Sequence, residues 1–234
     1  MADLSAFPIT RRWTPANPDV LQLYSFPTPN GVKVAIALEE LGLPYEAHRV
    51  TLKDADVKSD AFTSLNPNGK IPAIIDPDGP GSGPIGLWES HTILTYLAQK
   101  TGRLGGTDAR NRWEVQTWLA WQVAGLGPMF GQMGHFVKLG GAKVEDPYPR
   151  ERYVAESRRL LEVLDGRLAD RDWVAGEFSI ADIAIAPWLG TITGFYEAGD
   201  LVRFDELKNV PAYLARFMSR PGVQAGIDVP PRPS

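Results

Sequence analysis

Cysteine is absent from this 234-residue sequence, and histidine occurs only three times. The lack of cysteine excludes disulfide bonds, thiolate metal sites and thiol chemistry carried by the protein itself. His48, His91 and His135 lie far apart along the chain and lack the spacing of a helical zinc motif. We therefore expect no metal, and a reactive sulfur would have to arrive with a ligand.

An excess of positive charge is also missing, because 24 Lys and Arg residues stand against 28 Asp and Glu residues, a net charge of −4. This balance argues against sequence-independent binding of nucleic acid. No apolar run reaches the ~18 residues of a membrane span, and Met1–Val20 has no apolar signal-peptide core. We expect a cytoplasmic protein with neither a nucleic-acid nor a membrane partner.

The common nucleotide-binding and serine-hydrolase motifs are missing as well, since no GxGxxG opens a helix after a strand and no GxxxxGK[ST] or GxSxG pattern occurs. The composition is 44% hydrophobic and 22% charged, which is typical of a folded globular protein and not of a disordered one. The length allows one large domain or two modest ones.

Alternating strands and helices are predicted for the first half of the chain. The expected order is strand Leu21–Phe26, helix Val32–Leu41, a weaker strand Tyr45–Leu52, a short helical turn Ala55–Leu65, strands Ile71–Ile75 and Ile85–Trp88, and helix Ser90–Lys100. The Gly- and Pro-rich segment Asp76–Pro84 is long enough to turn the last two strands into an antiparallel hairpin. This half therefore has the order βαβ followed by ββα.

Helices alone are predicted after the Gly-rich connector Gly102–Thr107. They are expected within residues 111–136 with an interruption at Gly125–Pro128, along the apolar face from Tyr153 to Leu168, after Ser179, and within residues 200–218. Ser179 and Asp182 have the spacing of a capping box, which gives Asp182 a structural role. We divide the chain into an arm (1–20), an α/β domain (21–101) and an all-helical domain (108–225).

Three polar segments lie where predicted strands meet helices or turns: Thr28-Pro29-Asn30, Lys70-Ile71-Pro72 and Glu89-Ser90. Helix capping by itself accounts for Thr28 or Asn30, and for Ser90 with Glu89. Helix N-termini also attract anions, and strand ends converge when their strands are neighbours, so a ligand site is the alternative interpretation.

Two further features each allow two interpretations. Pro72 cannot donate a sheet hydrogen bond, so it indicates either an edge strand or a cis peptide bond. The aromatic and Met-rich stretch Trp118–Phe136 is either hydrophobic core or the lining of an apolar substrate cleft.

Five segments together resemble the cytosolic glutathione S-transferases, specifically the bacterial Nu class of disulfide-bond reductase type. They are residues 24–31 (YSFPTPNG), 66–73 (NPNGKIPA), 88–90 (WES), 121–129 (WQVAGLGPM) and 179–184 (SIADIA). The resemblance covers Leu21 to about Gly222 and implies an α/β thioredoxin-like N-terminal domain, an all-α C-terminal domain and a homodimer. It also implies that the reactive sulfur belongs to bound glutathione, in agreement with the lack of cysteine.

The same resemblance assigns roles to individual residues. Thr28 and Asn30 are expected to contact the glutathione sulfur. The remaining expected ligand contacts are Lys70 at the glycyl carboxylate, the Ile71 backbone at the cysteinyl peptide, the cis-proline Pro72, Glu89 with Ser90 at the γ-glutamyl end, and Arg152 from the neighbouring subunit.

The resulting hypothesis is a glutathione-dependent disulfide-bond oxidoreductase that acts on a small disulfide, with reduced or oxidised glutathione as co-substrate and no metal. A transferase, or a thioether- or ether-cleaving enzyme, would use the same thiolate on an electrophilic carbon. A non-catalytic glutathione-binding module is a third interpretation. The sequence leaves these alternatives open because the site that would activate sulfur is common to both enzymes.

Overall fold

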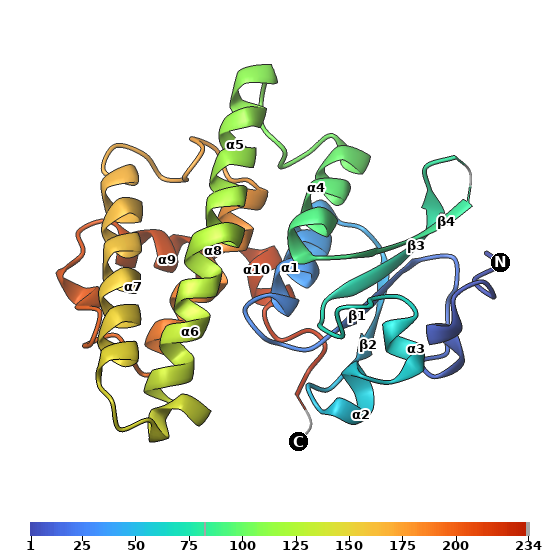
Figure 1. Ribbon diagram of the computed structural model, residues 1–234. Helices are drawn as coiled ribbons and strands as arrows, with labels where there is room; N and C mark the ends of the chain where they lie inside the picture. Colours follow the sequence, from blue (N-terminus) through green and yellow to red (C-terminus); the bar gives the residue numbers. More distant parts are fainter. Residues whose placement is uncertain (82, 233–234) are drawn as a thin grey trace. The chain divides into compact units, whose positions relative to one another are not determined.

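The computed structural model describes residues 1–81 and 83–232, which form two compact units (Figure 1). The first unit combines Met1–Thr101 with the segment that begins at Pro221, and the second unit is Gly102–Arg220. The segment from Pro221 thus packs with the first unit, although we assigned residues up to 225 to the helical domain. Within the described residues, no helix has both the length and the apolar character needed to cross a membrane.

A four-stranded mixed sheet forms the centre of the first unit. Its strands are β1 (Leu21–Ser25), β2 (Tyr45–Arg49), β3 (Ala73–Gly79) and β4 (Gly83–Trp88), in the order β2-β1-β3-β4. β1 is parallel to β2 and antiparallel to β3, and β3 is antiparallel to β4. This arrangement confirms the predicted βαβ and ββα order and the thioredoxin-like fold.

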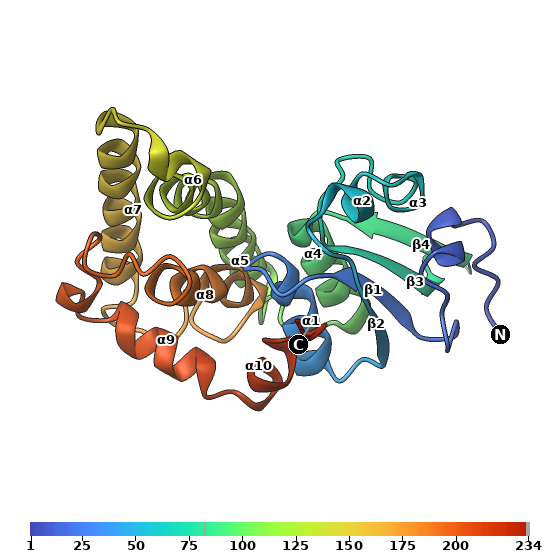
Figure 2. The same ribbon diagram turned by 90° about the horizontal axis from the view of Figure 1, so that it is seen from below.

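Helices cover both faces of this sheet (Figure 2). One face carries α1 (Gly31–Leu41) and α4 (Ser90–Thr101), and α10 (Pro221–Gly226) packs against α1. The short helices α2 (Asp54–Val57) and α3 (Asp60–Thr63) lie on the other face, where α3 packs against the 3₁₀ turn η1 (Pro8–Arg11). The helical turn that we expected over Ala55–Leu65 is thus two short helices.

The helix α1 is buried on more sides than the single apolar face that we predicted, because every residue from Gly31 to Leu38 is buried. It ends at Gly42, whose φ of 67° lies in the left-handed region that favours glycine. The buried set includes one charged residue, Lys33, which becomes important at the candidate site.

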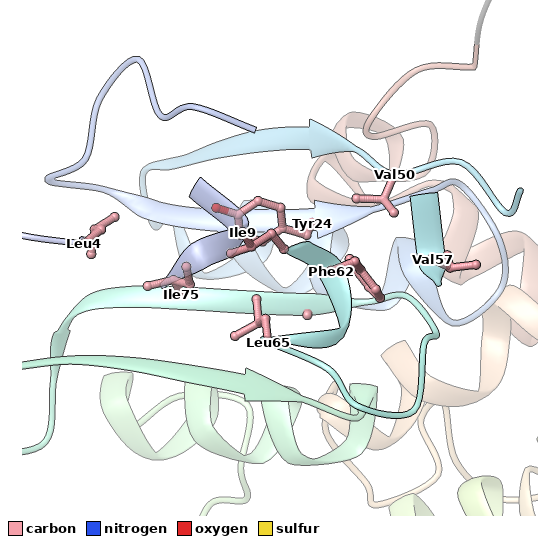
Figure 3. Packing of buried hydrophobic residues seen from close by; sticks show 9 residues of the cluster. Leu4, Ile9, Tyr24, Val50, Val57, Phe62, Leu65 and Ile75 are labelled. Atoms are coloured by element: carbon pink, nitrogen blue, oxygen red, sulfur yellow. The ribbon is translucent and has the colours of Figure 1, made fainter. Parts of the chain in front are cut away.

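The N-terminal arm is part of the hydrophobic core. Leu4 and Ile9 from the arm join Tyr24, Phe62 and other apolar residues in one buried cluster (Figure 3). Polar contacts hold the arm in place as well: the carboxylate of Glu46 accepts the backbone N–H groups of Ala16 and Asn17 at 2.9 Å. The arm therefore covers apolar sheet surface that would otherwise be exposed.

Two predictions about the β3–β4 hairpin were wrong in detail. The strands extend through most of the Gly- and Pro-rich segment Asp76–Pro84, which we expected to be a turn. The extension is possible because the pairing shifts register between Asp76 and Gly79, and this irregularity accommodates Pro77. The edge-strand interpretation of Pro72 was also wrong, because β3 lies between β1 and β4.

The described residues of the second unit form helices and no regular sheet. The long helices are α5 (Ala109–Trp121), α6 (Gly127–Val137), α7 (Tyr148–Arg167), α8 (Ile180–Thr193) and α9 (Val210–Met218), and the 3₁₀ turns are η3 (Gly140–Lys143) and η4 (Phe204–Glu206). The interruption that we predicted near Gly125 is a π-helical segment, η2 (Gln122–Leu126), which joins α5 to α6. On α7, Ser157, Leu160 and Leu164 are buried along the predicted face.

Candidate active site

The register of the sheet brings the three polar segments to one edge. Ala73, the first residue of β3, pairs with Tyr24 near the end of β1 and with Trp88 at the end of β4. The loops that follow β1 and β4 and the loop that precedes β3 therefore emerge side by side. The helices α1 and α4 also begin at this edge, so the positive ends of two helix dipoles face the same place.

The loop between β1 and α1 is closed by Thr28. Its hydroxyl oxygen accepts the N–H of Gly31 over 3.2 Å, and its carbonyl oxygen accepts the N–H of Val32 over 3.0 Å. Asn30 occupies the N-cap position, but its side chain makes no capping bond and the residue is exposed. Capping therefore explains Thr28 and not the side chain of Asn30.

The Asn30 side chain instead interacts with Lys33, whose Nζ donates to Asn30 Oδ1 over 2.8 Å. Lys33 is 1% exposed, and burial lowers its pKa to about 7, although the nearby carboxylate of Glu89 partly opposes this change. Our sequence analysis missed Lys33. The sequence feature that could have indicated its burial is a lysine in the first turn of a predicted helix, with apolar residues on both sides of it.

Asn66 organises the loop that carries Lys70. It is 2% exposed, its Nδ2 donates to the carbonyl oxygen of Lys70, and its Oδ1 accepts the N–H of Asn68 over 2.9 Å. Gly69 has a φ of 63°, which permits the tight turn between them. Lys70 is exposed at the edge of the sheet. Asn66 is a second residue whose role our sequence analysis did not assign.

The peptide bond between Ile71 and Pro72 is cis, the second of the two conformations that the sequence allowed. Pro72 is buried immediately before β3, and Ile71 packs partly against the core cluster that includes Val57 and Leu65.

Glu89 and Ser90 connect β4 to α4. Glu89 is exposed and has a φ of 68°, a left-handed conformation that is uncommon for residues with a side chain. Ser90 is buried and is the first residue of α4, so it is not the N-cap that we predicted. The difference of one residue arises because Glu89 makes the turn into the helix, and its carbonyl oxygen accepts the N–H of Ile93.

Arg152 belongs to the second unit, where it is exposed on α7. With Met129, Tyr148, Tyr153 and Arg159 it lines a cavity of about 520 Å³ between α6 and α7. The structure gives no ligand contact for it, and its role stays a prediction. Across the described residues, no group of three or more His, Asp or Glu side chains is arranged to hold a metal ion.

Asp182 has the structural role that we predicted. It is fully buried and accepts hydrogen bonds from the N–H of Val174, the N–H and hydroxyl of Ser179, and the hydroxyl of Tyr213, at 2.9 to 3.1 Å. Ser179 and Asp182 complete the capping box at the start of α8.

Comparison with known proteins agrees with this architecture. Residues 28–100 match the glutathione S-transferase N-terminal domain, and residues 126–216 match the glutathione S-transferase C-terminal domain. The chain is 42% identical to the disulfide-bond oxidoreductase YfcG of Escherichia coli over 204 residues, which cover 86% of this chain and 92% of that relative.

Two solved structures are more similar still. A glutathione transferase from Burkholderia graminis, which holds two glutathione molecules per subunit, is 56% identical with a TM-score of 0.97 and covers 100% of this chain and 98% of its own. A glutathione transferase from Pseudomonas putida, with one glutathione disulfide per subunit, is 54% identical with a TM-score of 0.96. The match covers 97% of this chain and 99% of that chain. This chain belongs to the glutathione S-transferase family.

Proposed function

We propose that this protein is a glutathione-dependent disulfide-bond oxidoreductase in which Thr28 and Asn30 stabilise the thiolate of bound glutathione. The observation that carries the proposal is the pairing of Ala73 with both Tyr24 and Trp88, because it gathers three polar segments and two helix N-termini at one edge. The names of the relatives support the same reaction class, since YfcG is a disulfide-bond oxidoreductase and the related structures hold glutathione or its disulfide.

The charges at this edge suit glutathione, which has two carboxylates and one ammonium group. Lys70 offers a cation for the glycyl carboxylate, and Glu89 offers an anion for the γ-glutamyl ammonium. Ser90, at the start of α4, offers backbone and hydroxyl donors for the γ-glutamyl carboxylate. The Ile71 backbone beside Pro72 is the proposed partner of the cysteinyl peptide.

Activation of the sulfur requires a modest free energy. A thiol with a pKa of about 8.5 must be lowered by roughly two pKa units to be mainly thiolate at neutral pH, which corresponds to about 2.7 kcal/mol. One hydrogen bond to a charged group contributes about 1.5–3 kcal/mol, and a helix N-terminus adds about 0.3–1 kcal/mol. The Thr28 hydroxyl accepts from Gly31 and keeps its own proton to donate, so Thr28, Asn30 and the α1 dipole suffice without a general base.

The proposed reaction uses two glutathione molecules in sequence. The bound thiolate attacks one sulfur of the disulfide substrate, forms a mixed disulfide and releases the first substrate thiolate. A second glutathione thiolate attacks the glutathione sulfur of the mixed disulfide and releases the second substrate thiolate. Glutathione is oxidised to its disulfide, the substrate disulfide is reduced by two electrons, and the two protons lost by glutathione protonate the two product thiols.

The test is glutathione-dependent reduction of bis(2-hydroxyethyl) disulfide, followed through the formation of glutathione disulfide. We expect the Thr28→Ala, Asn30→Ala double variant to lose at least about 100-fold in kcat/KM. A matched control with Asn17→Ala and Thr107→Ala changes exposed residues of the same types and should keep full activity. Turnover of the disulfide without glutathione, or a double variant as active as the control, would refute the proposal.

The alternative on electrophilic carbon is tested with 1-chloro-2,4-dinitrobenzene under the same conditions. Conjugation without disulfide reduction would assign the thiolate to transferase chemistry. Glutathione binding without either reaction would favour the non-catalytic binding module.

The apolar stretch Trp118–Phe136, the homodimer and the participation of Arg152 in the partner's site remain parts of this proposal. The mass of the protein in solution tests the homodimer, and the glutathione affinity of Arg152→Ala tests the role of Arg152.

A further inference from the structure

Lys33 combines two features that are unfavourable for stability. Its side chain is 1% exposed, and moving a charged ammonium group out of water costs free energy even where the group is paired. It also lies in the first turn of α1, where the helix dipole disfavours a cation. An apolar residue would suit this position better, as Val32, Val34 and Ala35 do at adjoining positions.

The contact that Lys33 makes points to a role beside the sulfur site. Its Nζ donates to Asn30 Oδ1 over 2.8 Å. A carboxamide has an acceptor end and a donor end, and an ammonium group has donors only. With the oxygen of Asn30 held by Lys33, the Nδ2 group is directed away from the ammonium, and Asn30 itself is exposed at the edge of the sheet.

The orientation of Asn30 decides what it can do for a thiolate. A sulfur anion needs a hydrogen-bond donor, so the Nδ2 group stabilises it and the Oδ1 atom repels it. A carboxamide that was free to flip would offer the wrong end part of the time. The bond to a cation also polarises the amide, which makes its N–H groups better donors.

We infer that Lys33 is a positioning residue for the sulfur site: it fixes the Asn30 carboxamide with Nδ2 directed to the glutathione thiolate. This inference rests on the proposed function, in which Asn30 contacts the sulfur. Glu89 acts in the same direction, because its negative charge opposes the lowering of the Lys33 pKa that burial causes.

The experiment measures the acidity of the glutathione thiol bound to the full-length protein, from the ultraviolet absorbance of the thiolate as a function of pH. Lys33→Met keeps the length of the side chain and removes the ammonium. We expect the thiol to bind its proton about tenfold more tightly than in the native protein. S-methylglutathione, which has no ionisable thiol, should bind to Lys33→Met within about twofold of its native affinity.

A double-variant cycle tests whether Lys33 acts through Asn30. In the Asn30→Ala background, Lys33→Met should change the acidity of the bound thiol by less than about twofold. Lys100→Met is the matched control, since Lys100 also bonds a side chain of the first unit, Asp76, over 2.9 Å. It should leave the acidity of the thiol unchanged.

The outcomes separate this inference from the proposed function. If Asn30→Ala leaves the acidity of the bound thiol unchanged, the proposed function fails. The inference about Lys33 is overturned if Asn30→Ala changes the acidity of the bound thiol and Lys33→Met does not. It is also overturned if the change in the double variant equals the product of the two single changes, because Lys33 would then act independently of Asn30. If Lys33→Met does not fold, Lys33→Gln takes its place: its amide accepts as well as donates, so the orientation is no longer enforced and we expect a change of about threefold.

Discussion

The indole Nε1 of Trp13 donates a hydrogen bond to the carbonyl oxygen of Arg49 over 3.1 Å, which joins the N-terminal arm to the end of β2. The Trp13 ring also meets Tyr24 and Phe62 edge-on, with ring centroids 6.3 and 6.4 Å apart. The N-terminal arm is therefore packed against the sheet and contributes to the stability of the first unit.

The first prediction concerns this contact. Trp13→Ala should lower the free energy of unfolding by about 2–3 kcal/mol, because it removes aromatic packing and one hydrogen bond from a partly buried position. Trp113, which is 75% exposed, is the control, and Trp113→Ala should change the free energy by less than about 0.5 kcal/mol. The free energies of unfolding of both variants are measured by urea denaturation. Equal losses in Trp13→Ala and Trp113→Ala would contradict a structural role for the arm.

Asn66 gives the second prediction. Asn66→Ala removes the side chain that bonds both Lys70 and Asn68, so the loop should lose the conformation in which, by our proposal, Lys70 meets the glycyl carboxylate. We expect KM for glutathione to rise about tenfold with kcat within about twofold, since the lost interaction is one of binding. Asn68→Ala, at an exposed position of the same loop, should leave both constants near their native values. A fall in kcat alone would argue against this role.

The left-handed conformation of Glu89 leads to the third prediction. Glu89→Gly should stabilise the fold by about 1 kcal/mol, because glycine adopts a φ of 68° without strain. The same change removes the proposed partner of the γ-glutamyl ammonium and should raise KM for glutathione about tenfold.

Glu197 is the matched control, because it has a φ of 52° and lies in the second unit. Glu197→Gly should relieve backbone strain without a change in KM. If both variants bind glutathione as the native protein does, the carboxylate of Glu89 is not a ligand contact.

The fourth prediction is a pH dependence of stability at Asp182. Burial raises its pKa to about 6, although four hydrogen bonds oppose the change, while in the unfolded chain the pKa has its ordinary value of 3.8. The folded state thus binds more protons between these values, so the contribution of Asp182 to stability is complete below about pH 4 and is lost as the pH rises through 6. The difference in unfolding free energy between the native protein and Asp182→Asn should therefore shrink by up to about 3 kcal/mol from about pH 4 to about pH 7.

Asp108 serves as the comparison for this titration. Its carboxylate accepts the N–H groups of Asn111 and Arg110 at the start of α5, and these bonds lower its pKa. Its contribution is present above the ordinary pKa and is lost as the pH falls. The difference between the native protein and Asp108→Asn should not shrink as the pH rises, and parallel behaviour of the two variants would refute the assignment.

Local signals determined much of this protein. The apolar period of 21–26 and 32–41, the glycine at 42 and the capping box of Ser179 and Asp182 act within a few residues, so the sequence by itself fixes these elements. The absence of cysteine likewise required that any reactive sulfur come from a ligand. The resemblance of five segments to glutathione transferases then supplied the fold and the candidate residues together.

Tertiary structure decided what depends on contacts between distant segments. Only the pairing of Ala73 with Tyr24 and Trp88 shows that three polar segments share one edge, since register is set by the whole sheet. The extension of β3 and β4 depended on an irregular pairing at Asp76, and the burial of the arm depended on a sheet face built elsewhere in the chain. Lys33 is the clearest case: the sequence shows a lysine in a helix, and only the folded chain shows its ammonium buried against Asn30.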